Sequence, residues 1–186
     1  MNWQPFYWEK LGDWMDESWM LPQEAVEFVL QHVEPGSVVV EFGSGHGSEV
    51  LSKHFDLHSF EHDEAWLGVT SSTYIHAPIE ENQHATEAGE TGWYDVEIVR
   101  QNWPKDVQCV IVDGPPGFIG RTGILSILDM LGKTSLIIVD DVDRNEESKL
   151  SSILSKKLEF HQTIHLVNKP RKNGSERRFA VLSRGV

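Results

Sequence analysis

The sequence is poor in cysteine, in long apolar runs and in positive charge. Its 186 residues include one cysteine, Cys109, which excludes a disulfide within the chain and favours a reducing cytoplasm. No apolar run approaches the length needed to span a bilayer. The first residues also lack the basic start and apolar stretch of a signal peptide. We therefore expect a cytoplasmic protein that has no membrane partner.

Positive charge is scarce, because 16 lysines and arginines face 29 aspartates and glutamates, for a net charge of −13. A protein this acidic repels phosphate backbones, so we expect a small-molecule substrate and no nucleic acid. The basic residues near the end of the chain favour either a solvated hairpin or contact with an anionic substrate or partner. They are Lys169, Arg171, Lys172, Arg177, Arg178 and Arg184.

The composition, with 39% apolar and 24% charged residues, is that of a globular protein, and the length suits one domain over residues 1–186. Aromatic and apolar residues recur at helical spacing near the N-terminus, at Trp3, Tyr7, Leu11 and Trp14. This pattern predicts an aromatic-rich helical extension over residues 1–20. Such a helix would dock on the domain, cover a binding site or form a homodimer contact.

Short β-branched runs alternate with helical stretches along the chain. Strands are expected at 37–42, 57–61, 73–77, 107–113 and 135–141, and helices at 46–54, 63–69, 93–102, 121–132 and 143–157. Two further β-rich runs, 161–168 and 177–183, flank a turn with Asn173-Gly174 and predict a hairpin. The pattern predicts an α/β fold, Rossmann-like and doubly wound. Its mostly parallel seven-stranded sheet would end in an antiparallel hairpin.

A glycine loop follows the first expected strand and opens a helix. It runs Glu41-Phe-Gly43-Ser-Gly45-His-Gly47, and glycine there allows a sharp turn and close backbone approach to a ligand. The spacing G-x-G-x-G differs from the dinucleotide pattern G-x-G-x-x-G. Glu61 ends the second expected strand, where an acidic side chain can accept both hydroxyls of a ribose. Alternatively, the loop is an ordinary turn and Glu61 a surface carboxylate.

Taken in order, these residues resemble the class I S-adenosylmethionine-dependent methyltransferases, and within them a group of small bacterial proteins. The resemblance spans about residues 19–183. Its most specific parts are Asp113-Gly-Pro-Pro-Gly117 and Asp140-Asp141-x-x-Arg144, which follow the fourth and fifth strands.

The resemblance implies S-adenosylmethionine as cofactor and assigns residues to it. Gly43, Gly45 and Gly47 would pack under its methionine and ribose, and Glu41 would hold the loop or the methionine ammonium. Glu61 would bind the ribose hydroxyls. Further contacts would come from His62, from Ala77 near the adenine, and from Asp113 next to the transferable methyl.

Asp113 is the candidate catalytic base or orienting group, with His46 and His62 as alternatives because histidine titrates near neutrality. Asp113, Asp140 and Asp141 also resemble the arrangement in catechol-type O-methyltransferases, so they could bind Mg²⁺, which would activate a hydroxyl. Alternatively, Asp141 caps the next helix, Asp140 pairs with Arg144, or Pro115-Pro116 holds Asp113 away.

The resemblance favours O-methylation of a small hydroxylated molecule or sugar. The run after the fourth strand lacks the Asn/Asp-Pro-Pro-Tyr/Phe signature of many N-methyltransferases. The alternatives are a non-catalytic or other nucleotide-binding Rossmann-like protein, for example an NAD-binding oxidoreductase. The substrate pocket is expected to be built by the N-terminus and by loops at residues 80–93 and 114–122, of which residues 80–93 are polar and acidic and are expected to have some mobility.

Overall fold

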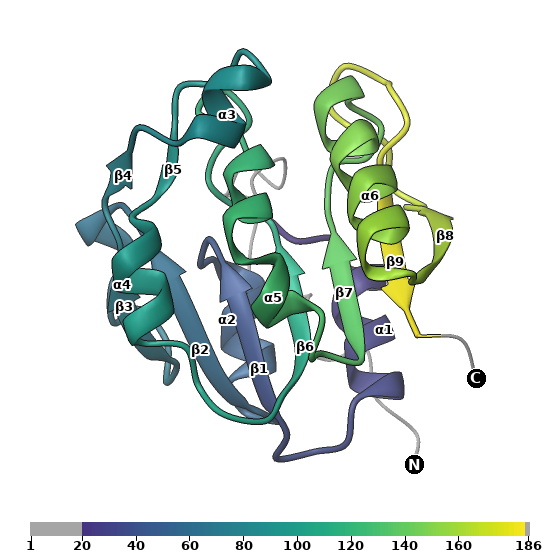
Figure 1. Cartoon of the computed structure of the whole chain (residues 1–186). Helices are drawn as coiled ribbons and strands as arrows, with labels where there is room; N and C mark the ends of the chain where they lie inside the picture. The colour runs from purple at the N-terminus through teal and green to yellow at the C-terminus, as the bar shows by residue number, and fades with distance from the viewer. Residues whose placement is uncertain (1–19, 185–186) are drawn as a thin grey trace.

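The computed structural model describes residues 20–184, which form a seven-stranded sheet between two layers of helices (Figure 1). The strand order is β3-β2-β1-β6-β7-β9-β8; β9 pairs antiparallel with both β7 and β8, and all other pairs in this sheet are parallel. This confirms the fold that the sequence predicts. The strands are β1 (Val38–Phe42), β2 (Asp56–Glu61), β3 (Thr73–His76), β6 (Val107–Val112), β7 (Leu136–Val139), β8 (His161–Leu166) and β9 (Arg178–Ser183).

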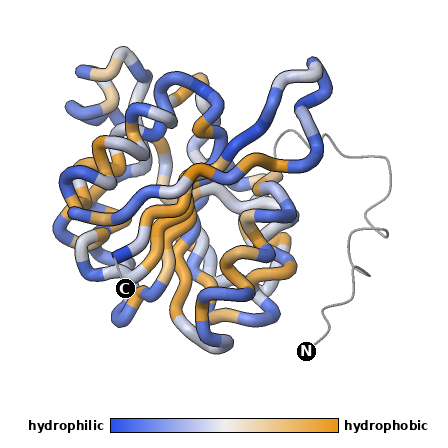
Figure 2. The backbone as a smooth tube through the Cα atoms, turned by 90° about the vertical axis from the view of Figure 1, so that its right-hand side faces the viewer, coloured by the Kyte–Doolittle hydropathy of each residue, from blue (hydrophilic) through white to orange (hydrophobic). Residues whose placement is uncertain are grey.

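Helices cover both faces of the sheet. One face packs against α1 (Gln23–His32) and α2 (His46–Leu51). The other packs against α4 (Val96–Gln101), α5 (Leu128–Leu131) and α6 (Asn145–Leu158). Alternate residues of each strand serve the two cores: Val39 belongs to the first and Val40 to the second, and both are fully buried. Figure 2 shows the resulting hydrophobic centre between more hydrophilic helices and loops.

Two expected helices are shorter than their patterns suggest. In place of a helix over 63–69 the chain makes one 3-10 turn, η3 (Glu64–Trp66), capped by Asp63, whose side chain accepts the Ala65 N–H at 3.0 Å. Gly68 then adopts φ +74°, which ends any helix. The expected helix 93–102 begins late, because Trp93 and Tyr94 form strand β5 and Asp95 caps α4.

The expected loop over residues 80–93 contains a short helix. The segment carries α3 (Gln83–Glu87), and around it β4 (Ile79–Glu80) pairs antiparallel with β5 (Trp93–Tyr94). Asn82 caps α3, and Glu90 accepts both the N–H and the hydroxyl of Thr122, at 2.8 Å each. These contacts fix the segment over η4 (Thr122–Ile127), which forms the first half of the expected helix 121–132.

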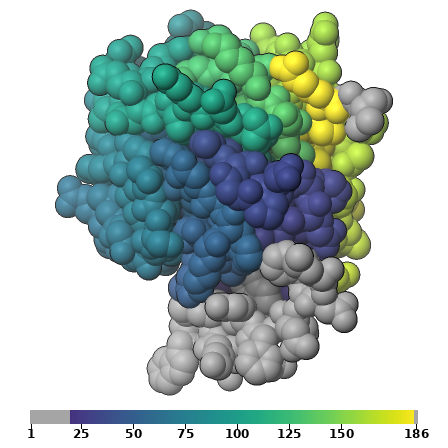
Figure 3. Space-filling model, turned by 90° about the horizontal axis from the view of Figure 1, so that it is seen from below, coloured from purple at the N-terminus to yellow at the C-terminus, as the bar shows by residue number. Residues whose placement is uncertain are grey.

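The beginning and the end of the described chain lie side by side. Seen from below, the residues that follow Met20 lie beside the last strand (Figure 3). Arg177 donates to the carbonyl of Met20 at 2.5 Å, and Glu24 accepts the Asn168 N–H at 2.9 Å. The predicted N-terminal extension lies outside the described residues. Among residues 20–184 no helix is both long and apolar enough to cross a membrane.

Candidate active site

A cavity of about 1000 Å³ lies at the carboxyl edge of the parallel strands. Parallel strands all end at this edge, so the loops that follow them meet there. The cavity wall includes the glycine loop after β1, the turn after β2, the loop after β6 and residues that follow β7. Of the residues predicted to bind cofactor, Gly43, Gly45, Glu61, His62 and Asp113 line it. Five of the eight residues predicted to bind the cofactor thus line one cavity.

Two glycines allow the loops after β1 and β6 to touch. Gly43 adopts φ +83°, and a Cβ on it would lie 2.9 Å from the Cα of Gly114. A Cβ on Gly114 would lie 2.5 Å from the hydroxyl of Tyr94 and 2.8 Å from the Cα of Gly43. No real Cβ has such neighbours, so this close approach requires glycine on both loops. Gly45 has open space around it, as a ligand-facing position requires.

Glu61 joins the glycine loop to the turn after β2. Its Oε1 accepts the N–H groups of His62 at 2.7 Å and Asp63 at 2.8 Å, and its Oε2 accepts the Ser44 N–H at 2.9 Å. The Ser44 hydroxyl makes a longer contact with Oε2, at 3.3 Å. A carboxylate has about four lone-pair positions. The weak hydroxyl contact is therefore the one that a ligand hydroxyl could replace.

Three residues of the predicted cofactor set lie behind the wall of the cavity and do not line it. Ala77 is fully buried, and its N–H donates to the carbonyl of Glu61 at 2.9 Å. Gly47 packs near Leu21 inside α2. Glu41 is 3% exposed and accepts the Ser59 hydroxyl at 2.5 Å. Burial raises the pKa of Glu41 to about 7 despite this hydrogen bond.

Tyr94 belongs to the cavity wall and was assigned no role from the sequence. Its side chain is 1% exposed, and its hydroxyl has no hydrogen-bond partner within the described chain. Burial, reinforced by the charge of Glu61, raises the pKa of Tyr94 well above its usual value, so the hydroxyl stays neutral. Tyr94 reaches the cavity wall only because β5 packs beside the edge of the sheet. The local sequence around Tyr94 carries no signal for this tertiary packing.

The two histidines considered as bases also line the cavity. His62 Nδ1 lies 2.8 Å from Oε1 of Glu61. The His46 ring meets the Trp66 ring edge to face, with centroids 6.1 Å apart. Both histidines lie on the glycine-loop side of the site, with Glu61 and Trp66.

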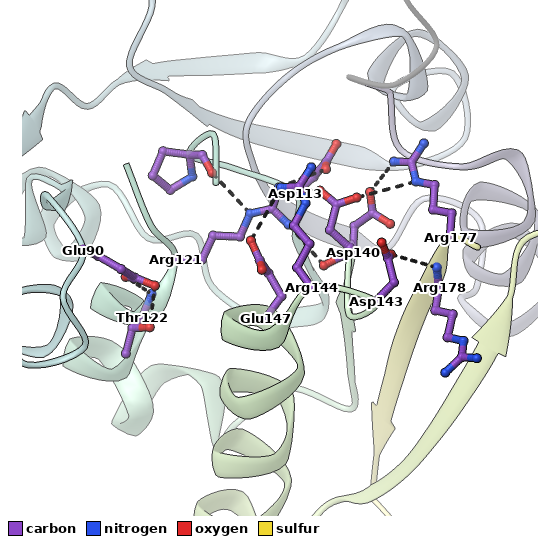
Figure 4. Close-up of polar contacts among 12 residues, drawn as sticks. Glu90, Asp113, Arg121, Thr122, Asp140, Asp143, Arg144, Glu147, Arg177 and Arg178 are labelled. Atoms are coloured by element: carbon purple, nitrogen blue, oxygen red, sulfur yellow. Dashed lines mark hydrogen bonds and ion pairs between the residues drawn. The ribbon is translucent and has the colours of Figure 1, made fainter. Parts of the chain in front are cut away.

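Arg121 links the loop after β6 to the loop after β7 (Figure 4). It is 4% exposed, and its Nη2 lies 3.2 Å from Oδ2 of Asp141 and 3.6 Å from Oδ1 of Asp113. Its remaining N–H groups donate to backbone carbonyls, from Nε to Pro115 at 3.2 Å and from Nη1 to Asp140 at 3.1 Å. Burial raises the pKa of Asp113, although the guanidinium of Arg121 opposes the shift.

Asp113, Asp140 and Asp141 come together as predicted, with one oxygen of each within 4.8 Å of the others. Guanidinium groups surround them. Arg177 contacts Asp140 at 2.5 Å, and Asp141 contacts Arg171 at 2.5 Å and Arg144 at 3.2 Å. Two residues of the basic C-terminal segment, Arg171 and Arg177, are thus parts of this cluster.

These surroundings have opposite effects on two of the carboxyl groups. Burial raises the pKa of Asp140 well above its usual value. For Asp141 burial acts in the same direction, but Arg121, Arg144, Arg171 and Arg177 together lower its pKa. The three carboxyl groups offer the oxygens that Mg²⁺ prefers. The guanidinium groups that contact those oxygens would repel a metal cation, so this arrangement of side chains does not fit a bound Mg²⁺ ion.

Comparison with known proteins identifies the fold. No protein-family model and no curated protein matches the sequence. Among solved structures, an O-methyltransferase from Bacillus cereus in complex with SAH superposes with a TM-score of 0.59 at 9% identity, over 89% of this chain and 83% of that one. The O-methyltransferase TomG from Streptomyces achromogenes, in complex with SAM, has a TM-score of 0.55 at 14% identity, over 89% and 82%.

The methyltransferase domain of a bacterial Hen1 is similar to the same degree, with a TM-score of 0.54 at 11% identity, over 88% of this chain and 96% of that domain. The protein therefore has the Rossmann-like fold of S-adenosylmethionine-dependent methyltransferases. Similar structures also include an Mtq2–Trm112 complex responsible for methylating a translation termination factor. The fold alone thus does not select the methyl acceptor.

Proposed function

We propose that the protein is an S-adenosylmethionine-dependent methyltransferase that O-methylates a small hydroxylated molecule or a sugar. The observation that carries the proposal is that one cavity joins the glycine loop, Glu61 and Asp113 at the carboxyl edge of the sheet. Structures with this fold are known in complex with SAM and with SAH. A cofactor of this kind would span the cavity from Glu61 to Asp113.

Glu61 would hold the ribose hydroxyls, one of which would replace the Ser44 hydroxyl, the most distant hydrogen-bond donor to that carboxylate. Gly43 and Gly45 would leave room for the methionine part, and Asp113 would lie on the acceptor side of the site. The methyl of a sulfonium is already activated, so the protein needs mainly to align the acceptor oxygen with it. As the acceptor oxygen bonds to the methyl carbon and the bond from that carbon to sulfur breaks, Asp113, whose pKa burial raises, would accept the proton that the hydroxyl loses.

The other side of the cavity supports a hydroxylated acceptor. Arg144, Arg171, Glu146 and Glu147 line it and offer both hydrogen-bond donors and acceptors. Phe118 lies at the cavity and is 75% exposed, so its ring is available to an apolar face of a ligand. Polar groups that fix several hydroxyls, together with one aromatic ring, suit a sugar better than a purely aromatic acceptor.

Calorimetric titration with S-adenosylhomocysteine tests the cofactor. We expect the wild type to bind it and Glu61→Ala to bind at least about tenfold more weakly, a loss of about 1.4 kcal/mol. Glu64→Ala is the matched control, because it removes an exposed carboxylate from the same turn outside the cavity wall. Absence of binding to folded wild type would contradict the proposal, as would equal binding by wild type and Glu61→Ala.

A further inference from the structure

The carboxylates that end β6 and β7 already hold a cation, and that cation is a side chain. Arg121 lies against the oxygens of Asp113 and Asp141 and donates to the carbonyl of Asp140. It contacts all three residues that could otherwise hold a metal ion. Its fourth contact, to the carbonyl of Pro115, fixes the orientation of the guanidinium.

Both the backbone and the side chain of Arg121 are fixed in position. It directly precedes η4, where Glu90 binds the N–H and the hydroxyl of the next residue, Thr122. The side chain is almost completely buried, and Figure 4 shows it pointing from this anchored turn toward Asp113 and Asp140. A buried guanidinium with four contacts cannot move aside without leaving its own charge unpaired.

Carboxyl and guanidinium groups in the cluster are nearly equal in number while Arg121 is present. Five carboxylates, those of Asp113, Asp140, Asp141, Asp143 and Glu147, face the four guanidinium groups of Arg121, Arg144, Arg171 and Arg177. Without Arg121 the carboxyl groups would outnumber the guanidinium groups by two. In addition, Oδ1 of Asp140 is buried and has no hydrogen-bond partner among residues 20–184.

We propose that Arg121 takes the place of a divalent cation, so that the three carboxylates bind Mg²⁺ or Mn²⁺ only when this guanidinium is removed. The inference is independent of the proposed function, because it concerns the cation at this site and not the cofactor. Its consequence for the site is that a permanent charge holds the loops after β6 and β7 together. Guanidinium does not titrate in the usual range, and it cannot be removed by a chelator.

Titration with Mn²⁺ alone tests the inference on the wild type, Arg121→Gln and Arg121→Lys. The glutamine variant removes the guanidinium that contacts all three aspartate residues and leaves those of Arg144, Arg171 and Arg177, whereas the lysine variant keeps a positive charge at the same position. We expect Mn²⁺ to leave the melting temperatures of wild type and Arg121→Lys unchanged. It should raise that of Arg121→Gln by about 3–6 °C at a tenfold excess over the dissociation constant. Adding Asp141→Asn to Arg121→Gln should abolish the shift.

Mn²⁺ binding by the wild type that Asp141→Asn removes would overturn the inference. An Arg121→Gln protein that folds but ignores Mn²⁺ would overturn it as well. If Arg121→Gln does not fold alone, recovery of the folded protein when Mn²⁺ is present during refolding supports the inference. Failure to fold both with and without Mn²⁺ overturns it, because the freed carboxylates then do not take up the cation.

Discussion

At the scale of single residues, the Tyr94 hydroxyl is a buried polar group that the described chain leaves without a partner. Such a group costs about 1–3 kcal/mol of desolvation, so Tyr94→Phe should leave the free energy of unfolding unchanged or raise it by about 1 kcal/mol. The cavity that Tyr94 lines supplies the reason to keep it, because a bound ligand can satisfy the hydroxyl. We therefore expect Tyr94→Phe to bind S-adenosylhomocysteine several-fold more weakly.

Tyr74→Phe is the matched control for this prediction. The Tyr74 hydroxyl lies 3.0 Å from the Thr70 hydroxyl, and Tyr74 does not line the cavity. Its loss should lower the free energy of unfolding by about 1 kcal/mol and leave ligand binding unchanged. Urea unfolding and calorimetry measure both quantities. A Tyr94→Phe variant that is less stable yet binds as well as wild type would refute the assignment.

Glu41 predicts a pH dependence of stability. Its pKa is raised to about 7 in the folded protein from about 4.5 in the unfolded chain. The folded state therefore holds the extra proton between these values, and the stability this provides is lost as pH rises from about 4.5 to about 7. The full loss amounts to about 3 kcal/mol. Glu41→Gln stays neutral at both pH values. The free energy of unfolding of this variant minus that of wild type should therefore be larger at pH 8 than at pH 5.

Urea unfolding of both proteins at pH 5 and pH 8 checks this prediction. The comparison uses the difference between variant and wild type, because the other acidic groups titrate in both proteins and cancel. A difference that stays constant between the two pH values would mean that Glu41 titrates normally. In that case Ser59 and its neighbours would stabilise the charged form better than burial opposes it.

At the scale of elements, the contact between the loops after β1 and β6 should be the most sensitive feature. Gly114→Ala would place a Cβ 2.5 Å from the Tyr94 hydroxyl and 2.8 Å from the Cα of Gly43. Because one neighbour is backbone, we expect a loss of about 1–3 kcal/mol and a melting temperature lower by several degrees. Gly45→Ala meets nothing within 4 Å and should melt like wild type.

Ligand binding separates these two variants further. Gly45 lines the cavity, so a methyl group on it should weaken S-adenosylhomocysteine binding without affecting the fold. Thermal melting followed by calorimetry distinguishes the two effects. A Gly114→Ala protein as stable as wild type would show that the two loops can separate at little cost.

The strands and their order could be predicted because β-branched runs such as those in β1 and β6 are local signals. The carboxyl ends of parallel strands share one edge, so Glu61 and Asp113 could be assigned to one site from the sequence. The short elements could not be predicted in the same way. Trp93 and Tyr94 fit the helical pattern that follows them, and only pairing with Ile79 and Glu80 makes them a strand.

The role of Arg121 shows the limit of such prediction for the site. A sequence does not reveal which of several carboxylates an arginine contacts in the folded protein. The metal hypothesis followed from three aspartates at strand ends, and these do meet. The guanidinium groups that contact them come from the residue before η4, from the start of α6 and from the hairpin, which are distant along the chain.

At the scale of the whole molecule, ligand binding should stabilise the fold in a way that separates the two nucleotide cofactors considered. A ligand at a hundredfold excess over its dissociation constant stabilises the folded state by about 2.7 kcal/mol. For a chain of this size that corresponds to a rise in melting temperature of about 5–10 °C. S-adenosylhomocysteine should produce this rise, because its one ribose and its amino-acid end match Glu61 and the glycine loop.

NADH serves as the comparison in the same melting experiment. The loop after β1 has G-x-G-x-G spacing, which is not the pattern that binds a pyrophosphate, and the carboxylate of Glu61 lies against this loop, where it accepts the Ser44 N–H. A pyrophosphate would meet electrostatic repulsion there, whereas the sulfonium and ammonium groups of S-adenosylmethionine would be attracted. We therefore expect no shift with NADH. A shift with NADH and none with S-adenosylhomocysteine would favour an oxidoreductase on the same fold.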